Sequence, residues 1–182
     1  MLYLVKPDLT YYEKYNDMMR EWVLSNTQIA PWFLDKPLSL EDFAKLIQKL
    51  DEYEHANQDK EYSSTTSYFV VDENDKLIGA ASLRHYLTIK GLNTWGHIGY
   101  GVRPSERKKG YGTQILKLVL KEARDKKIYK VLIGCHKSNI GSCKVIENCN
   151  GILENTVIDQ DNLEKINRYW INNKEDIKWV EK

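Results

Sequence analysis

The chain has 182 residues, of which 42% are hydrophobic and 29% are charged, and its formal net charge is +1 at pH 7. This length suits one domain with a sizeable core, and the composition is ordinary for a globular protein. The near-zero net charge argues against a strong overall attraction to nucleic acid or to a membrane surface. No apolar run approaches the length of a membrane span, and residues 1–7 lack the features of a signal peptide.

The three cysteines, Cys135, Cys143 and Cys149, match no zinc-ligand spacing, and the chain has only four histidines. We therefore expect no metal site. Cysteines without such a pattern are typical of reduced thiols in a cytoplasmic protein, which is the localisation we expect.

The N-terminal part of the chain predicts one strand and two helices. Residues 2–5 form a short apolar run, which indicates a first strand. Apolar residues then recur at helical spacing over 9–25, with Thr10 as the candidate N-cap. A second helix is expected to begin after Ser39, which with the aspartate three residues later approximates a capping box.

The middle of the chain predicts three antiparallel strands and then a crossover. The apolar segments 66–71, 77–87 and 95–102 are separated by turn residues. A helical pattern over 112–126 leads to a buried strand at 131–135. This strand–helix–strand order implies a parallel crossover.

The C-terminal part predicts a short helix over about 139–148 and a hairpin formed by 152–158 and 165–171. Nothing repeats and no linker divides the chain, so we expect a single domain over 1–182. The element order predicts an α+β fold with a mixed, mostly antiparallel sheet of six or seven strands flanked by helices. The C-terminal hairpin could supply an exposed edge for a homodimer.

The turn after the strand 95–102 is rich in cations and ends in glycines. Free N–H groups at a helix start, together with the helix dipole, favour an anion there. Glycine lets the backbone approach closely, and Arg107, Lys108 and Lys109 can supply charge-assisted hydrogen bonds. The turn therefore predicts a phosphate site, with a solvated basic loop as the alternative. It is neither a Walker A loop nor a dinucleotide fingerprint.

The spacing of Arg107, Gly110 and Gly112, Arg-x-x-Gly-x-Gly, resembles the acetyl-CoA pyrophosphate loop of the GNAT superfamily of N-acetyltransferases. The resemblance extends to the flanking strand and helix, to the strand 131–135 and to the Asn-Ile-Gly-Ser helix start at 139–142. It implies a GNAT-like acyl-CoA N-acyltransferase fold and acetyl-CoA as the cofactor. The implied reaction is acetyl transfer to a primary amine of a small molecule or peptide.

Three further stretches, Arg84-His85, Gly96 to Tyr100 and Arg168 to Trp170, look similar to a bacterial branch of predicted acetyltransferases within this superfamily. In the family, a loop that matches the apolar residues 29–34 lies over the substrate. These residues are thus a candidate wall of the acceptor pocket, and a plug on the core is the alternative. The acidic segment 51–61 is either a solvated face or an electrostatic guide for a cationic amine.

The resemblance also implies which residues hold the cofactor. In the family, backbone groups just before the loop bind the pantetheine arm and polarise the thioester carbonyl. Gly99 and Gly101 would permit a local bulge that separates this strand from the next. Asn139 matches a family asparagine on the other side of the cofactor, although it could equally cap its helix. The expected cofactor-binding residues are Gly101, Val102, Arg103, Arg107, Lys108, Lys109, Gly110, Tyr111, Gly112, Thr113, Asn139 and Ser142.

The general base is sought on the central strand, where many family members carry a glutamate. The nearest equivalent here is Gly96, with His97 beside it. An imidazole has an ordinary pKa near 6.5, which suits proton acceptance at neutral pH. We therefore expect His97 to act as the base, with a purely structural histidine as the alternative and His85 and His136 as rivals.

The general acid departs from the family pattern. Many members carry a tyrosine about eight positions after the asparagine, and residues 145–147 include none. Tyr100, our candidate, or Tyr169 could donate the proton instead, or the thiolate could leave without an acid because thiols are far more acidic than alcohols. Cys135 has no base at motif spacing, so a covalent acyl-cysteine is not expected.

The expected function is an acetyl-CoA-dependent N-acetyltransferase in which the amine attacks the thioester directly in a ternary complex. A non-catalytic acyl-CoA-binding or sensory module is the alternative, because a fold and a cofactor site do not guarantee chemistry. A third reading, in which the cluster 103–109 binds nucleic acid, is disfavoured by the near-neutral charge. We expect neither nucleic acid nor membrane among the partners.

Overall fold

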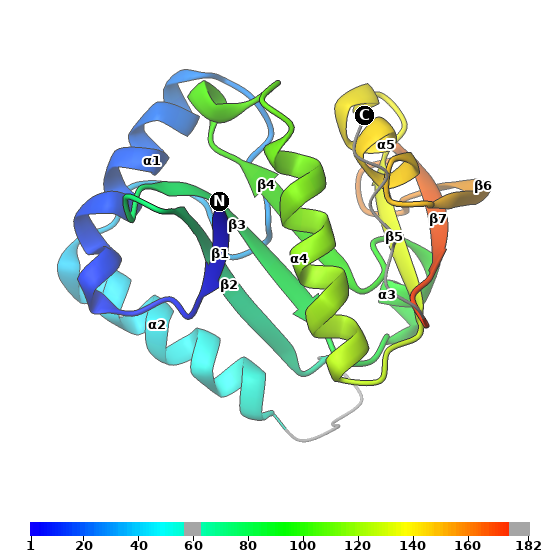
Figure 1. The fold of residues 1–182 in the computed structure, drawn as a ribbon, viewed down its shortest axis with the longest axis horizontal. Coiled ribbons are helices and arrows are strands. Elements are labelled where there is room, and N and C mark those ends of the chain that lie inside the picture. Colours follow the sequence, from blue (N-terminus) through cyan, green and yellow to red (C-terminus); the bar gives the residue numbers. More distant parts are fainter. Residues whose placement is uncertain (57–62, 175–182) are drawn as a thin grey trace.

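The computed structural model describes residues 1–56 and 63–174, and this part of the chain forms an α+β fold of seven strands and five α-helices (Figure 1). Asp59 and Glu61 of the acidic segment lie outside the described residues. The strands are β1 (Leu2–Val5), β2 (Thr65–Asp72), β3 (Leu77–Arg84), β4 (Ile98–Val102), β5 (Lys130–His136), β6 (Ile152–Ile158) and β7 (Lys165–Asn172). The helices are α1 (Tyr12–Leu24), α2 (Leu40–His55), α3 (Ile89–Asn93), α4 (Tyr111–Asp125) and α5 (Ile140–Glu147), with single 3-10 turns η1 (Leu9–Tyr11) and η2 (Pro104–Glu106).

The strands form two hydrogen-bonded antiparallel sheets, one in the order β1-β2-β3-β4 and one in the order β5-β7-β6. The α+β class and the seven strands agree with the sequence prediction. As expected from the predicted separation of the strand 95–102 from the next, no ladder joins β4 to β5. The sheets instead meet at one isolated antiparallel bridge between Gly96 and Ile133.

Gly96 explains why β4 starts at Ile98 rather than at residue 95. Its φ of +70° is a left-handed backbone conformation that residues other than glycine rarely adopt. A Cβ atom on Gly96 would also lie 2.1 Å from the carbonyl oxygen of Leu132. The chain therefore turns against β5 at this glycine, and the bridge cannot be extended into a regular ladder.

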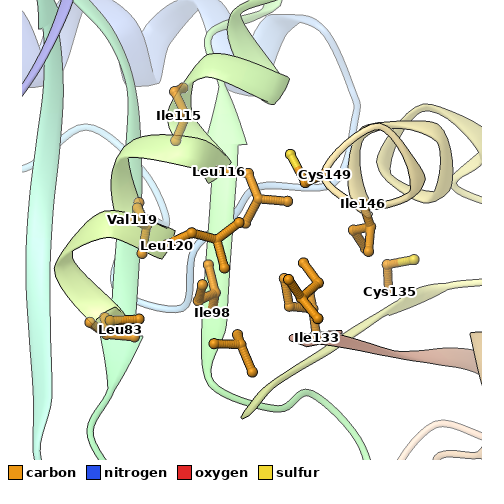
Figure 2. Close-up of a cluster of buried hydrophobic side chains, with 14 of the residues drawn as sticks. Leu83, Ile98, Ile115, Leu116, Val119, Leu120, Ile133, Cys135, Ile146 and Cys149 are labelled. Atoms are coloured by element: carbon orange, nitrogen blue, oxygen red, sulfur yellow. The ribbon is translucent and has the colours of Figure 1, made fainter. Parts of the chain in front are cut away.

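Two hydrophobic clusters lie on opposite faces of the four-stranded sheet. One cluster packs α4 and α5 against β3, β4 and β5, and Figure 2 shows its side chains converging from these elements. The other cluster packs α1 and α2 on the opposite face and contains the aromatic rings of Tyr15, Phe43 and Phe69, which contact one another at tilted angles. The helical periodicities seen in the sequence thus mark the buried faces of these helices.

The loop 29–34 covers one face of β4. Successive residues of a strand face opposite sides. Ile98 belongs to the cluster beneath α4, whereas Gly99 and Gly101 face the loop. A Cβ atom on Gly101 would lie 2.1 Å from the carbonyl oxygen of Ala30, so only glycine allows this approach. Within the loop, Phe33 and Leu34 are buried, while Trp32 is 41% exposed.

One of the two N-caps predicted in the N-terminal part of the chain is confirmed, and the other is wrong. Ser39 caps α2 by accepting a hydrogen bond of 3.1 Å from the backbone N–H of Asp42, as predicted. Thr10 does not cap the first helical segment, because Asp8 accepts the hydrogen bond from the Thr10 N–H. The short helix α3 was not predicted; its cap is Thr88.

Candidate active site

The start of α4 is the clearest candidate site for a phosphate group. Gly110 holds the N-cap position with φ +80°, and no side chain caps the helix. Within the described part of the chain, the backbone N–H groups of Tyr111, Gly112 and Thr113 have no acceptor. A Cβ atom on Gly110 would meet nothing within 4 Å, so the space beside this glycine is open. An anion could therefore approach the positive end of the helix dipole.

The cations around this turn are held in different ways. The guanidinium group of Arg103 pairs with Asp17 at 2.6 Å and with Glu21 at 2.5 Å, both on α1. Lys109 pairs with the buried Glu106 at 2.9 Å. Lys108 has a φ of 62°, its side chain is exposed, and it has no ion pair among the described residues. Of these three, Lys108 is thus the cation most available to a phosphate.

Arg107 is turned toward the loop between α1 and α2. Its Nε–H donates to the carbonyl oxygen of Val102 at 3.1 Å, and its Nη1–H donates to Oγ1 of Thr27 at 3.0 Å. Its guanidinium carbon also lies 5.5 Å from the ring centroid of Trp22. These contacts place Arg107 where it ties the end of β4 to α1 and the following loop. Sequence reasoning missed the partners Thr27 and Trp22, because no local pattern marks contacts so distant along the chain.

Tyr100, Asn139 and Ser142 form a connection between β4 and the start of α5. The Asn139 side chain accepts a hydrogen bond of 3.0 Å from the Ser142 N–H and so caps α5. The hydroxyl groups of Ser142 and Tyr100 lie 3.0 Å apart. Burial raises the pKa of Tyr100 well above its ordinary value of 10, so its hydroxyl stays protonated at neutral pH.

Gly112 brings the start of α4 close to the same connection. A Cβ atom on Gly112 would lie 3.1 Å from Cγ2 of Val145 and 3.9 Å from Cε2 of Tyr100. The predicted cofactor residues at 110–113 and at 139–142 are therefore brought to neighbouring positions on α4 and α5. The tertiary structure places them around the end of β4 that has no ladder to β5.

His97, the predicted base, is buried between the two sheets. Its backbone N–H donates to the carbonyl oxygen of Leu132 at 2.7 Å, and its Nδ1 accepts a hydrogen bond of 3.0 Å from the Leu132 N–H. The neutral ring therefore carries its proton on Nε2. Burial lowers the pKa of His97 to about 4. Both features disfavour proton acceptance at neutral pH and agree with the structural alternative.

The two rival histidines lie in different surroundings. The ring of His85 is held by Ser64 at 2.9 Å from Nδ1 and by Thr66 at 2.8 Å from Nε2. Burial lowers the pKa of His85 below its ordinary value. His136 pairs with Glu164, and its ring packs edge-on against Trp95 with the centroids 5.0 Å apart.

The cysteines and Tyr169 belong to the core beneath α5. The Sγ atoms of Cys135 and Cys143 are 3.5 Å apart, and all three cysteines are free and buried. Burial raises the pKa of Cys135 to about 12, which suppresses its thiolate and argues against a nucleophilic role. The hydroxyl of Tyr169 donates to Oε1 of Glu147 at 3.3 Å, where it remains inside the core.

Residues 1–56 and 63–174 contain neither a metal-binding cluster nor a helix that could span a membrane. No group of three or more histidine, cysteine or acidic side chains is arranged to hold a metal ion. None of the helices in this part of the chain is both long enough and apolar enough to cross a membrane.

The model of the acetyltransferase (GNAT) family matches residues 26–151, which is more than half of the chain. The protein therefore belongs to the GNAT acetyltransferase family. No curated protein sequence matches the chain.

Several solved structures share the fold. RimL, a ribosomal L7/L12 alpha-N-protein acetyltransferase in complex with coenzyme A, is 19% identical with a TM-score of 0.71, and the match covers 96% of each chain. The microcin C7 self-immunity acetyltransferase MccE, in complex with acetyl-CoA and AMP, is 18% identical with a TM-score of 0.69 over 94% of this chain and 92% of its own. The dodecameric spermidine N-acetyltransferase from Vibrio cholerae is 16% identical with a TM-score of 0.65 over 99% of this chain and 98% of its own. At these identities the likeness concerns the fold alone.

Proposed function

We propose that this protein is an acetyl-CoA-dependent N-acetyltransferase that transfers an acetyl group to a primary amine by direct attack in a ternary complex. The uncapped start of α4, with three N–H groups that have no acceptor among the described residues and open space beside Gly110, is the observation that carries this proposal. Membership of the family supports the reaction class. The complexes of RimL with coenzyme A and of MccE with acetyl-CoA support the choice of cofactor.

The pyrophosphate of acetyl-CoA would lie at the start of α4. The N–H groups of Tyr111, Gly112 and Thr113 would donate to its oxygens, and Lys108 would add a charge-assisted hydrogen bond. Arg107 and Arg103 would act through their contacts with α1 and the following loop, which hold this end of β4 in place. We thus assign the side chain of Lys108 to binding and those of the two arginines to positioning.

The pantetheine arm would lie along β4 toward α5. Gly101 pairs with Ala80 of β3, and the carbonyl oxygen of Val102 accepts from Arg107, so the N–H of Val102, which has no partner strand on the β5 side, is the candidate to bind an amide of the arm. Asn139 caps α5 through its Oδ1, which leaves its Nδ2 free to donate. Ser142 would hold Tyr100 beside the arm.

The chemistry would need few protein side chains. The amine nitrogen attacks the thioester carbonyl carbon, the carbon–sulfur bond breaks, and the coenzyme A thiolate leaves. Because the hydroxyl of Tyr100 stays protonated, it is our candidate donor to that thiolate. We propose that the amine releases its proton to water rather than to His97, because Nδ1 of His97 is already occupied by the Leu132 N–H.

A non-catalytic acyl-CoA-binding module is the second candidate. It is favoured by the surroundings of His97 and by the lack of a tyrosine among residues 145–147. Localisation in the cytoplasm and a homodimer remain predictions. The strand that would form the dimer edge is β6, whose Ile152 is 74% exposed.

Calorimetric titration of the protein with acetyl-CoA, followed by thioester consumption with a panel of amines, separates these candidates. Saturable binding with amine-dependent release of coenzyme A supports the transferase. Binding without turnover for any amine supports the binding module. If acetyl-CoA did not bind at all, both candidates would be wrong.

A further inference from the structure

Arg84, at the end of β3, has no counter-ion for its guanidinium group among the described residues. Its Nη1–H donates a hydrogen bond of 3.0 Å to the carbonyl oxygen of Gly96, and in this part of the chain the group makes no other hydrogen bond. No carboxylate of the described residues pairs with it, and the side chain is half-buried. Burial alone lowers the pKa of Arg84, since no acidic group opposes the shift.

Two other half-buried arginines show what a satisfied side chain looks like in this protein. Arg103 pairs with Asp17 and Glu21, and Arg168 pairs with Glu154 at 3.0 Å. A buried cation normally has such a partner, because removing a charge from water is costly. Arg84 has no such partner among the described residues. Arg107 has none there either, but it donates to two acceptors, whereas the guanidinium group of Arg84 donates to one, which favours an anion that this part of the chain does not supply.

The free edge of the guanidinium group has the geometry that recognises a carboxylate. With Nη1 bound to Gly96, the Nε–H and one Nη2–H remain, and these two point in the same direction. Neither nitrogen is a fully buried atom without a partner. These two N–H groups can thus donate to the two oxygens of one carboxylate.

Arg84 also lies near the place where an acceptor would enter. Its backbone N–H donates to the carbonyl oxygen of His97 at 2.8 Å, so it is next to the start of β4. Leu83 belongs to the cluster beneath α4, and alternation directs Arg84 to the opposite face, the one that the loop 29–34 covers.

The distance along β4 limits the shape of the ligand. Arg84 is held at Gly96, and Gly99 lies three residues further along the chain. Three residues of extended chain span at most about 10 Å, and the turn at Gly96 shortens this separation. An acceptor that spans it would carry its carboxylate several bonds away from its amine.

We infer that Arg84 binds a carboxylate group of the acceptor, so that the substrates are amines that carry a carboxylate several bonds away, such as short peptides or ω-amino acids. This inference rests on the proposed N-acetyltransferase function. It makes Arg84 a specificity-determining residue and disfavours polyamines, whose positive charges the guanidinium group would repel.

The test compares matched amines that differ only in the carboxylate. Acetyl transfer is measured with 6-aminohexanoate and its carboxamide, and with triglycine and its carboxamide, for the wild type, Arg84→Gln and Arg84→Lys. Arg20→Gln, on the exposed face of α1, is the matched control. We expect the wild type and the control to favour the carboxylate by at least about tenfold in kcat/KM. The ratio should fall to about 1 in Arg84→Gln and to an intermediate value in Arg84→Lys.

A binding measurement keeps the inference separate from turnover. The acetylated products, 6-acetamidohexanoate and its carboxamide, are titrated into the wild-type protein with coenzyme A present. Selective binding of the carboxylate supports the inference even if no transfer occurs, in which case only the transferase proposal fails. Equal binding of both compounds, or transfer without any preference for the carboxylate, would overturn the role of Arg84 and leave the transferase proposal intact. Equal binding of the carboxylate and the carboxamide by the wild type would overturn the inference even if the Arg84 variants do not fold.

Discussion

The backbone N–H of Leu132 on β5 donates a 3.0 Å hydrogen bond to Nδ1 of His97, the residue before β4. Together with the hydrogen bond from the His97 N–H to the Leu132 carbonyl oxygen, it joins the two sheets. The imidazole thus performs the pairing that a ladder between β4 and β5 would otherwise provide. This contact gives His97 a role in stability, and the first prediction follows from it.

Stability should fall as the pH decreases through the range set by His97. Its pKa is 6.5 in the unfolded chain and about 4 in the folded protein. Between these values the unfolded state binds the proton and the folded state does not, so acid favours unfolding. The full difference corresponds to about 3 kcal/mol. Urea unfolding at pH 7 and pH 5 should show a loss of about 2 kcal/mol from this residue.

His97→Asn provides the control for this prediction, because the amide can still accept a hydrogen bond but does not titrate in this range. The variant should lose less stability than the wild type over the same pH interval. An equal loss in both proteins would show that other groups cause the acid sensitivity.

Lys108→Gln should weaken acetyl-CoA binding by about tenfold, because the variant loses a charge-assisted contact with the phosphates. Lys127→Gln is the matched control, since Lys127 is also exposed and has a φ of 63°, close to the 62° of Lys108. It lies beyond the other end of α4. Titration calorimetry at two salt concentrations measures both variants. Equal affinities for Lys108→Gln and the wild type would contradict the assignment.

Two glycine variants should differ in stability because of their surroundings. Gly110→Ala places a Cβ atom in open space but keeps a φ of +80°, which costs about 1–2 kcal/mol. Gly101→Ala places its Cβ atom 2.1 Å from the Ala30 carbonyl oxygen and 2.7 Å from Cη2 of Trp22. The loop 29–34 must then move, at a cost of at least about 3 kcal/mol. Urea unfolding ranks the two variants, and a larger loss for Gly110→Ala would show that the loop does not press on β4.

The thiols of Cys135 and Cys149 should react slowly with a disulfide reagent such as 5,5′-dithiobis(2-nitrobenzoate) in the folded protein. Burial raises their pKa values to about 12 and about 11, so very little thiolate exists at pH 8. All three cysteines of the chain should react rapidly in guanidinium chloride. Fast reaction of Cys135 under native conditions, shown by its loss in Cys135→Ala, would reopen the covalent mechanism.

Much of the fold was predictable because the signals are local. The period of the apolar residues located α1, α2 and α4, and Asn139 was correctly placed at the start of α5. The sequence also predicted that β4 separates from β5, and no ladder joins these strands, but the antiparallel bridge between Gly96 and Ile133 was not predicted. The left-handed turn at Gly96 and its close contact with Leu132 prevent a ladder, and a sequence pattern does not reveal which backbone a glycine will approach.

The candidate site, like the fold, was predictable only in part from the sequence. The candidate anion site before α4 could be predicted from sequence alone, because glycine and lysine at a helix start favour an anion through local backbone geometry. Which cations are free to bind a phosphate depends on contacts that form on folding. Arg103 is neutralised by acidic side chains of α1, whereas Lys108 has no ion pair among the described residues. Folding also places His97 at the junction of the sheets and leaves Arg84 without a counter-ion among residues 1–56 and 63–174. The physical reason is that charge and protonation depend on partners far away in the chain, which only folding brings into contact.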